Sequence, residues 1–324
     1  MERTQILSAA TAYSDHLDPA AEQLLSGVKA QGYPGWAYLT IEQARGMVAS
    51  MRSLAGEPES VGHVEDIVIP GTPAIPARVY IPKADGPLPI IVYFHAGGWA
   101  LGEYMDIDTP VRALANHSGC AILSVNYRLA PEHKYPAAVE DAYRAVQWAS
   151  QSGEQFGWDG QRLAVMGDSA GGTLATVACL KARDEGGPPI QFQVMVYPIL
   201  DHSYDTGSYL KFGSSWGVLT KTDMMWFHCH YLSHPDQLNL PYVSPLHSAD
   251  LAGLPEALLI LPEADPLRDE GLLYAEQLRK AGVPAETRVY PGMIHGFWQM
   301  GAMLPQAFAA IDYAAGVLRS RLAS

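Results

Sequence analysis

The chain has 324 residues, of which 48% are hydrophobic and 17% charged, and its formal net charge at pH 7 is −13. This composition excludes a disordered chain and indicates a globular protein with one large core and an elaboration. Because nucleic acids and anionic lipids attract clustered Lys and Arg, the acidic balance argues against both kinds of partner.

Cysteine usage and hydropathy bear on the compartment. Cys120, Cys179 and Cys229 are odd in number and widely spaced, so they predict neither a disulfide framework nor a zinc motif. Such usage fits a reducing compartment. No apolar run follows the first residues as a signal peptide would require, and none reaches the ~20 residues of a membrane helix. We therefore expect a cytoplasmic protein with no stable membrane association.

The first 55 residues predict helices. Asp18 and Pro19, followed by acidic Glu22, are typical of a helix start. Thr40 and Gln43 have the spacing of a capping box and predict a second helix. No strand pattern occurs before residue 60.

The rest of the chain alternates between apolar runs and amphipathic stretches. We expect strands at 63–69, 77–81, 89–94, 120–125, 163–166, 190–197, 257–261 and 287–290. We expect helices at 108–118, 137–150, 170–185, 220–232, 270–281 and 305–322. Near-continuous apolar strands alternating with helices predict an α/β fold with a mostly parallel eight-stranded sheet and helices on both faces.

About 60 residues between Tyr197 and Ala257 interrupt this alternation. An insertion between two core strands is expected at the carboxyl edge of the sheet, where α/β proteins bind ligands. We therefore expect residues 56–200 and 241–324 to form the main domain. Residues 201–240 would form a cap, to which the helices of residues 1–55 contribute.

The strongest chemical signal is Gly167-Asp168-Ser169-Ala170-Gly171, which follows an apolar strand and opens a helix. A G-x-S-x-G motif in this context predicts a nucleophilic serine on a sharp turn, where glycines prevent a steric clash. A second match, at 213–217, would make Ser215 the nucleophile. No buried strand precedes that match and bulky Trp216 stands beside the serine, so Ser169 is preferred.

The glycine-rich loop after the 89–94 strand reads His95-Ala96-Gly97-Gly98-Trp99. Acyl transfer needs N–H donors for the oxygen of the tetrahedral intermediate. We expect the amides of Gly97, Gly98 and Ala170 to supply them, the alternative being an ordinary glycine turn. His95 is expected to stabilise the loop by hydrogen bonding.

A catalytic serine also needs a histidine base and a carboxylate that orients it, in the chain order Ser, acid, His. His295, just after the last predicted strand, is favoured over His247, which precedes the acid. Three carboxylates follow the 257–261 strand, at Glu263, Asp265 and Asp269. Asp265 is preferred, because Asp269 resembles the cap of the next helix.

Together, these motifs strongly resemble those of the bacterial hormone-sensitive-lipase-like (family IV) carboxylesterases of the α/β-hydrolase fold. The matching segments are His95–Trp99, Asn126–Glu132, Pro136–Ala138, Gly167–Gly172, Ser244–Leu246, Asp265–Glu270 and Gly292–Phe297. The resemblance implies a capped hydrolase that acts on short- to medium-chain esters without a cofactor. It also supports Asp265 over Glu263, and it leaves room for a homodimer, since dimers are common in the family.

The family loop usually reads His-Gly-Gly-Gly, and this chain has Ala96 in place of the first glycine. A Cβ there restricts the backbone if φ must be positive, whereas the expected donors remain. Thr173, where the family often has Asn, is a smaller departure.

The resemblance leaves the substrate pocket and two other functions open. The candidate substrate-binding residues are Trp99, Asp168, Phe212, Trp216 and Phe297. Hydrolysis of amides, carbamates or formamides would need the same machinery as ester hydrolysis. A non-catalytic small-molecule receptor is disfavoured, because relatives of that kind typically lack the histidine.

The histidines of the insertion lack the spacing of a metal site. On a helix, His228 and His230 would point about 200° apart, so they could not share one ion. His230 and His234 could pair one helical turn apart, but Pro235 ends that helix and no carboxylate assists. No metal is therefore expected.

Overall fold

The computed structural model describes residues 13–84, 86–214 and 217–323. A single sheet contains the strands β1 (His63–Ile69), β2 (Ile75–Ile81), β3 (Leu88–Phe94), β4 (Ala121–Val125), β5 (Trp158–Asp168), β6 (Phe192–Val196), β7 (Glu256–Ala264) and β8 (Ala285–Ile294). Their spatial order is β1-β2-β4-β3-β5-β6-β7-β8. The pairs β1/β2 and β2/β4 are antiparallel and the other pairs are parallel. The expected eight-stranded, mostly parallel sheet is confirmed.

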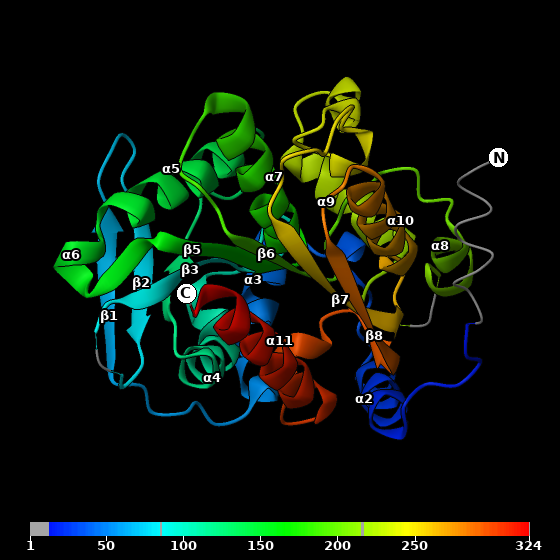
Figure 1. Ribbon diagram of the computed structural model, residues 1–324. Coiled ribbons are helices and arrows are strands. Elements are labelled where there is room, and N and C mark those ends of the chain that lie inside the picture. The colour runs from blue at the N-terminus through cyan, green and yellow to red at the C-terminus, as the bar shows by residue number, and fades with distance from the viewer. Residues whose placement is uncertain (1–12, 85, 215–216, 324) are drawn as a thin grey trace.

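Helices cover both faces of this sheet (Figure 1). They are α2 (Pro19–Ala30), α3 (Ile41–Ser50), α4 (Asp108–Ser118), α5 (Ala137–Gln151), α6 (Gly153–Phe156), α7 (Ala170–Glu185), α8 (Gly207–Phe212), α9 (Lys221–Tyr231), α10 (Arg268–Lys280) and α11 (Gln306–Leu322). Apolar residues of α5, α7 and α10 pack with one face of the sheet, and those of α4 and α11 with the other. Consecutive residues of β3 show this division, because Val92 joins the first core and Tyr93 the second. The central strands are apolar throughout because both faces are buried.

The two N-terminal helices begin as their sequence predicts. The side chain of Asp18 accepts a hydrogen bond from the Ala20 amide of α2. Thr40 and Gln43 form a complete capping box at the start of α3. These caps satisfy amides that have no partner within the helix.

The register of the parallel strands brings distant segments to one edge. Phe94 at the end of β3 lies beside Gly167 of β5, and Asp168 lies beside Val196 at the end of β6. Parallel strands all point their carboxyl ends to the same edge, so the loops that follow them meet there.

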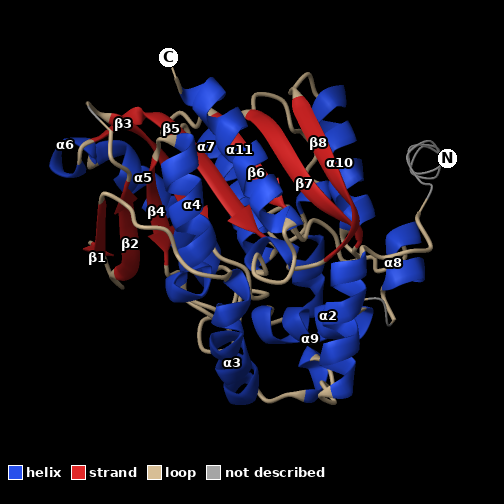
Figure 2. Ribbon diagram, turned by 90° about the horizontal axis from the view of Figure 1, so that it is seen from below, coloured by secondary structure: helices blue, strands red, loops and turns tan. Residues whose placement is uncertain are grey.

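Parts of the N-terminal region and of the insertion meet beyond this edge, where α3 and α9 lie past the end of the sheet (Figure 2). The Ala37 amide donates to Asp223 of α9 at 2.8 Å, and Trp36 Nε1 donates to the Val218 carbonyl at 3.1 Å. Both expected cap segments therefore contact each other directly. No helix among the described residues has the length and apolar character to cross a membrane.

Candidate active site

Ser169 occupies the turn between β5 and α7. Its backbone has φ 56° and ψ −121°, a left-handed conformation that side chains with a Cβ rarely adopt. The turn presents the hydroxyl at the carboxyl edge of the sheet, and the residue is 5% exposed. Strain held at one residue by well-packed surroundings is typical of a functional site.

The glycines around Ser169 make this turn sterically possible. A Cβ on Gly167 would lie 2.2 Å from the carbonyl oxygen of Gly171. A Cβ on Gly171 would lie 1.9 Å from the carbonyl oxygen of Phe94. The start of α7 therefore touches both its own strand and the end of β3, which supports the steric reason for the G-x-S-x-G spacing.

The structure brings together the three side chains of the expected triad. His295, in the loop after β8, places Nε2 3.1 Å from Ser169 Oγ. Its Nδ1 lies 2.8 Å from Asp265 Oδ2. Asp265 is fully buried, and its other oxygen accepts a hydrogen bond from the Leu267 amide. With Asp265 accepting a hydrogen bond from Nδ1–H, the lone pair of Nε2 faces the serine hydroxyl.

The two rejected carboxylates have other partners. Glu263 accepts hydrogen bonds from the amides of Ser14 and Gly292, so it holds an N-terminal segment against the end of β8. Asp269 accepts from the Tyr13 hydroxyl at 2.6 Å and from the Ser208 amide. The rejected base, His247, places Nε2 2.9 Å from Asp201. The rejected nucleophile, Ser215, lies outside the described residues.

The loop after β3 brings its glycines to the serine. Gly97 has φ 122° and Gly98 has φ 57°, and both line the same cavity as Ser169. Within the described part of the chain, neither amide has a hydrogen-bond acceptor. These N–H groups are therefore available to an oxygen in the cavity. Ala96 also lines the cavity, and its φ is not positive, so the alanine adds no backbone strain.

His95 has the supporting position that its sequence context predicts. Its ring is buried and stacks on Tyr127 with ring centroids 4.4 Å apart. Nδ1 lies 2.7 Å from the Ala96 carbonyl oxygen, and Tyr127 donates to the His95 carbonyl. Burial lowers the pKa of His95, so the ring is neutral at pH 7.

A cavity of about 120 Å³ contains Ser169 and His295 in its lining. The insertion contributes Val218, Leu219, Met224 and Phe227 to it. The N-terminal region contributes Trp36, Val48, Met51, Arg52 and Leu54. Most of these side chains are apolar, as in other ligand sites. The two expected cap segments thus both contribute to the wall of the cavity that contains Ser169.

Most of the predicted substrate-binding side chains lie elsewhere. Trp99 is fully buried and stacks on Tyr231 with centroids 4.3 Å apart. Phe212 packs edge-on against Tyr13, and Phe297 packs edge-on against Tyr197. None of the three lines the cavity. Their aromatic type indicated apolar surroundings but not which way each ring points.

The remaining two predicted substrate-binding residues are Trp216 and Asp168. Trp216 lies outside the described residues. Asp168 is fully buried and does not line the cavity. It accepts hydrogen bonds from Tyr93 at 2.9 Å, Tyr197 at 3.2 Å and Gln299 at 2.6 Å. Burial raises its pKa to about 6, although these three donors oppose the rise. Asp168 therefore holds two residues that line the cavity, Tyr197 and Gln299, and does not itself line it.

Residues of α9 are among the parts of the cavity wall that sequence reasoning left unassigned. Met224 and Phe227 are buried and line the cavity, whereas Met225 is half exposed. Residues three apart share one face of a helix, whereas the next residue along faces away. Helical periodicity within this Met- and aromatic-rich stretch could therefore have identified the lining pair.

Comparisons with known proteins agree with the fold. A family model described as the alpha/beta hydrolase fold matches residues 91–299. The chain belongs to the α/β-hydrolase family. Carboxylic ester hydrolase LipN of Mycobacterium tuberculosis is 39% identical over 314 residues, covering 94% of this chain and 83% of that protein. Carboxylesterase NlhH of the same species is 37% identical over 290 residues, covering 87% and 90%.

Among solved structures, a hyperthermophilic esterase from the archaeon Pyrobaculum calidifontis matches this α/β-hydrolase with a TM-score of 0.90 and 40% identity. The match covers 94% of this chain and 98% of that one. The resemblance to hormone-sensitive-lipase-like esterases that the motifs indicate is thereby confirmed.

Proposed function

We propose that this α/β-hydrolase is a carboxylesterase that hydrolyses short-chain carboxylic esters through Ser169, His295 and Asp265. The observation that carries the proposal is the unbroken chain of contacts from Ser169 Oγ through both ring nitrogens of His295 to a buried carboxylate. The ester hydrolases and esterases among its relatives support the choice of ester as the substrate class.

The proposed reaction has two acyl-transfer steps. His295 Nε2 takes the Ser169 proton as Oγ bonds to the ester carbonyl carbon, and the carbonyl π electrons move to the oxygen. When the tetrahedral intermediate collapses, the bond to the alcohol oxygen breaks and His295 gives its proton to the leaving alcohol. A water molecule then attacks the acyl-enzyme with the same base, releasing the carboxylic acid and restoring Ser169. Asp265 stays ionised and stabilises the imidazolium.

The negative oxygen of the intermediate needs fixed donors. Gly97 and Gly98 line the cavity, and their amides have no acceptor within the described chain. Ala170 begins α7, and the first amides of a helix have no partner within it. We assign the oxyanion hole to these three N–H groups. Each such donor typically contributes about 3 kcal/mol to transition-state stabilisation.

The cavity limits the size of the acyl group. Its volume of about 120 Å³ is small beside the ~300 Å³ at the lower end of common ligand pockets. Phe227 closes it against the oxyanion loop, since a Cβ on Gly98 would lie 2.0 Å from the Phe227 ring. We therefore propose a preference for short acyl chains, with residues 201–240 and the helices of residues 1–55 acting as the cap.

Hydrolysis of p-nitrophenyl esters from acetate to dodecanoate tests the proposal. The highest kcat/KM is expected for the shortest acyl groups. Ser169→Ala and His295→Ala should each lower kcat by at least ~10⁴-fold, because the two residues act as one unit. Ser320→Ala, which alters an exposed serine of α11, is the matched control and should leave kcat unchanged. Retention of more than about 1% of turnover in Ser169→Ala would contradict the assignment.

A further inference from the structure

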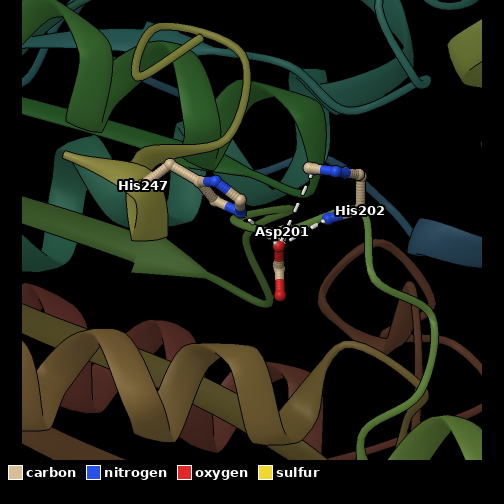
Figure 3. Close-up of side chains that lie close together, drawn as sticks. All are labelled: Asp201, His202 and His247. Atoms are coloured by element: carbon tan, nitrogen blue, oxygen red, sulfur yellow. Dashed lines mark hydrogen bonds and ion pairs between the residues drawn. The ribbon is translucent and has the colours of Figure 1, made fainter. Parts of the chain in front are cut away.

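A second cluster of polar side chains lies at the base of the insertion, apart from the triad (Figure 3). Asp201 and His202 stand where the chain leaves β6 for the insertion. His247 belongs to the short 3-10 helix η5 (Pro245–His247), where the chain returns toward the core. One ligand atom from each residue lies within 4.8 Å of the other two. The fold thus joins residues that are more than 40 positions apart in sequence.

The geometry of these atoms is close to that of a metal site. Asp201 Oδ1 lies 2.9 Å from His247 Nε2 and 3.8 Å from His202 Nδ1. Figure 3 shows both imidazoles turned toward the Asp201 carboxylate. Zinc bonds of about 2.0–2.1 Å in tetrahedral geometry place ligand atoms about 3.3 Å apart. Side-chain shifts of a few tenths of an ångström, up to about 1.5 Å for the widest pair, would bring all three atoms to one ion.

Neighbouring groups hold the ligands in place. Asp201 is buried, and its second oxygen accepts a hydrogen bond from Ser203 at 2.9 Å. The Asp201 amide donates to the buried carboxylate of Glu270 on α10. His202 Nδ1 lies 3.1 Å from the hydroxyl of buried Ser244, and a bound ion would replace this hydrogen bond, because Nδ1 has a single lone pair. The hydrogen bonds at Asp201 are outer contacts of the kind that orient metal ligands and contribute to their affinity.

The donor set selects the kind of metal. Two imidazole nitrogens and one carboxylate oxygen suit zinc and similar transition metals, whereas magnesium and calcium prefer oxygen ligands alone. Three protein ligands leave a fourth position for water. The His247 side chain is 34% exposed, so an ion has a path from solvent. The net charge of −13 also favours the approach of a cation.

Another histidine with two carboxylate partners shows that closeness of possible ligands alone does not make a metal site. His117 contacts Glu59 through Nε2 at 3.1 Å and Asp312 through Nδ1 at 2.6 Å. Because opposite ring nitrogens are used, these two carboxylates lie on opposite sides of the imidazole and do not converge on one ion. Only around Asp201 do three such ligand atoms meet within the described residues.

We propose that Asp201, His202 and His247 form a zinc site that ties together the two ends of the insertion. The segment between them carries Met224 and Phe227, which line the cavity at Ser169. A bound ion would therefore steady the wall of the substrate pocket without touching the triad. This site departs from the expectation of no metal, which rests on the spacing of the cysteines and of His228, His230 and His234.

Calorimetric titration of the chelator-treated full chain with ZnCl₂ tests the site. The wild-type chain should bind one equivalent. His202→Gln and His247→Gln should each weaken binding by at least about tenfold, since an amide can keep a hydrogen bond to Asp201 but is a poor zinc ligand. His117→Gln is the matched control and should bind zinc as the wild type does. Equal affinity in the wild type and in His247→Gln would overturn the proposal.

Thermal unfolding provides a second readout that does not depend on activity. Zinc at about 100 times its Kd should raise the Tm of the wild type by roughly 2–5 °C and leave that of His247→Gln unchanged. MgCl₂ at the same concentration should have no effect on either chain. An equal shift with magnesium, or an equal zinc shift in His247→Gln, would contradict a site of this chemistry. Circular dichroism establishes that each variant is folded before it is titrated.

Discussion

Gly171→Ala is the sharpest perturbation that the turn at Ser169 offers. The added Cβ would lie 1.9 Å from the carbonyl oxygen of Phe94, 2.5 Å from its carbon and 2.7 Å from the His95 oxygen. All three are backbone atoms, so no side chain can rotate away. The backbone φ of Gly171 is not positive, so alanine can adopt this conformation. The free-energy cost of the substitution is therefore purely steric.

The size of the effect follows from these distances. Real Cβ contacts essentially never fall below 3.0 Å, so α7 and the end of β3 must separate by about 1 Å. Overpacking of this kind typically costs about 1–3 kcal/mol, and the upper end is expected because backbone must move. The same displacement shifts Ser169 relative to the loop of Gly97 and Gly98. A misplacement of about 1 Å can lower turnover by about 10²-fold.

Urea unfolding and steady-state kinetics measure both consequences. Gly316→Ala is the control, because Gly316 lies within α11 with nothing within 4 Å of its added Cβ. That change should raise the free energy of unfolding by about 0.5–1 kcal/mol and leave kcat unaltered. If Gly171→Ala were as stable and as active as the wild type, contact between α7 and β3 could not be what positions the serine.

Three further changes test separate parts of the site. Asp265→Asn should lower kcat by about 10⁴-fold while Glu263→Gln changes it less than about tenfold, because only Asp265 orients His295; comparable losses would leave the acid unassigned. Phe227→Ala should move the acyl preference in a p-nitrophenyl ester series toward longer chains, and an unchanged preference would remove Phe227 from the acyl wall. Asp168 has a folded-state pKa of about 6, above the ordinary value of 3.8, so its contribution to stability is largest at low pH and is lost as the pH rises through 6. Between pH 5 and pH 7.5 the stability of the wild type relative to Asp168→Asn should therefore fall by about 1 kcal/mol in urea unfolding, and a rise would contradict the sign.

Much of the fold could be predicted because burial dictates sequence pattern. Central strands such as β3 and β4 are apolar at almost every position, since helices cover both faces. Strand ends were harder to place. β5 begins at Trp158, five residues before the predicted start, because Asp159, Gln161 and Arg162 prevent a continuous apolar run in this segment.

The three side chains of the candidate triad could be proposed from sequence because each follows a predicted strand or turn. Backbone position decides where Ser169, Asp265 and His295 lie, and the chain order of strands brings them to one edge. The substrate wall was less accessible to this reasoning. Trp99 has φ 59°, which turns its ring toward Tyr231 and away from the cavity, and no local pattern encodes that turn.

The cluster at Asp201 was also beyond sequence reasoning. His202 and His247 have no ligand spacing along the chain, and only the packing of η5 beside the end of β6 brings them together. The two histidines singled out on α9 have separate partners, since His228 contacts Tyr204 and His230 contacts the Trp226 carbonyl. Periodicity relates residues within one element, whereas contacts between elements require the topology.

Covalent labelling tests the central claim most directly. The full chain is treated with one equivalent of the organophosphate paraoxon, and the modified peptide is mapped by mass spectrometry. The account predicts one diethylphosphoryl group per chain, on Ser169, with loss of ester hydrolysis in proportion to labelling and no labelling of Ser169→Ala. A label on another residue that abolishes activity, or full activity with Ser169 labelled, would contradict it.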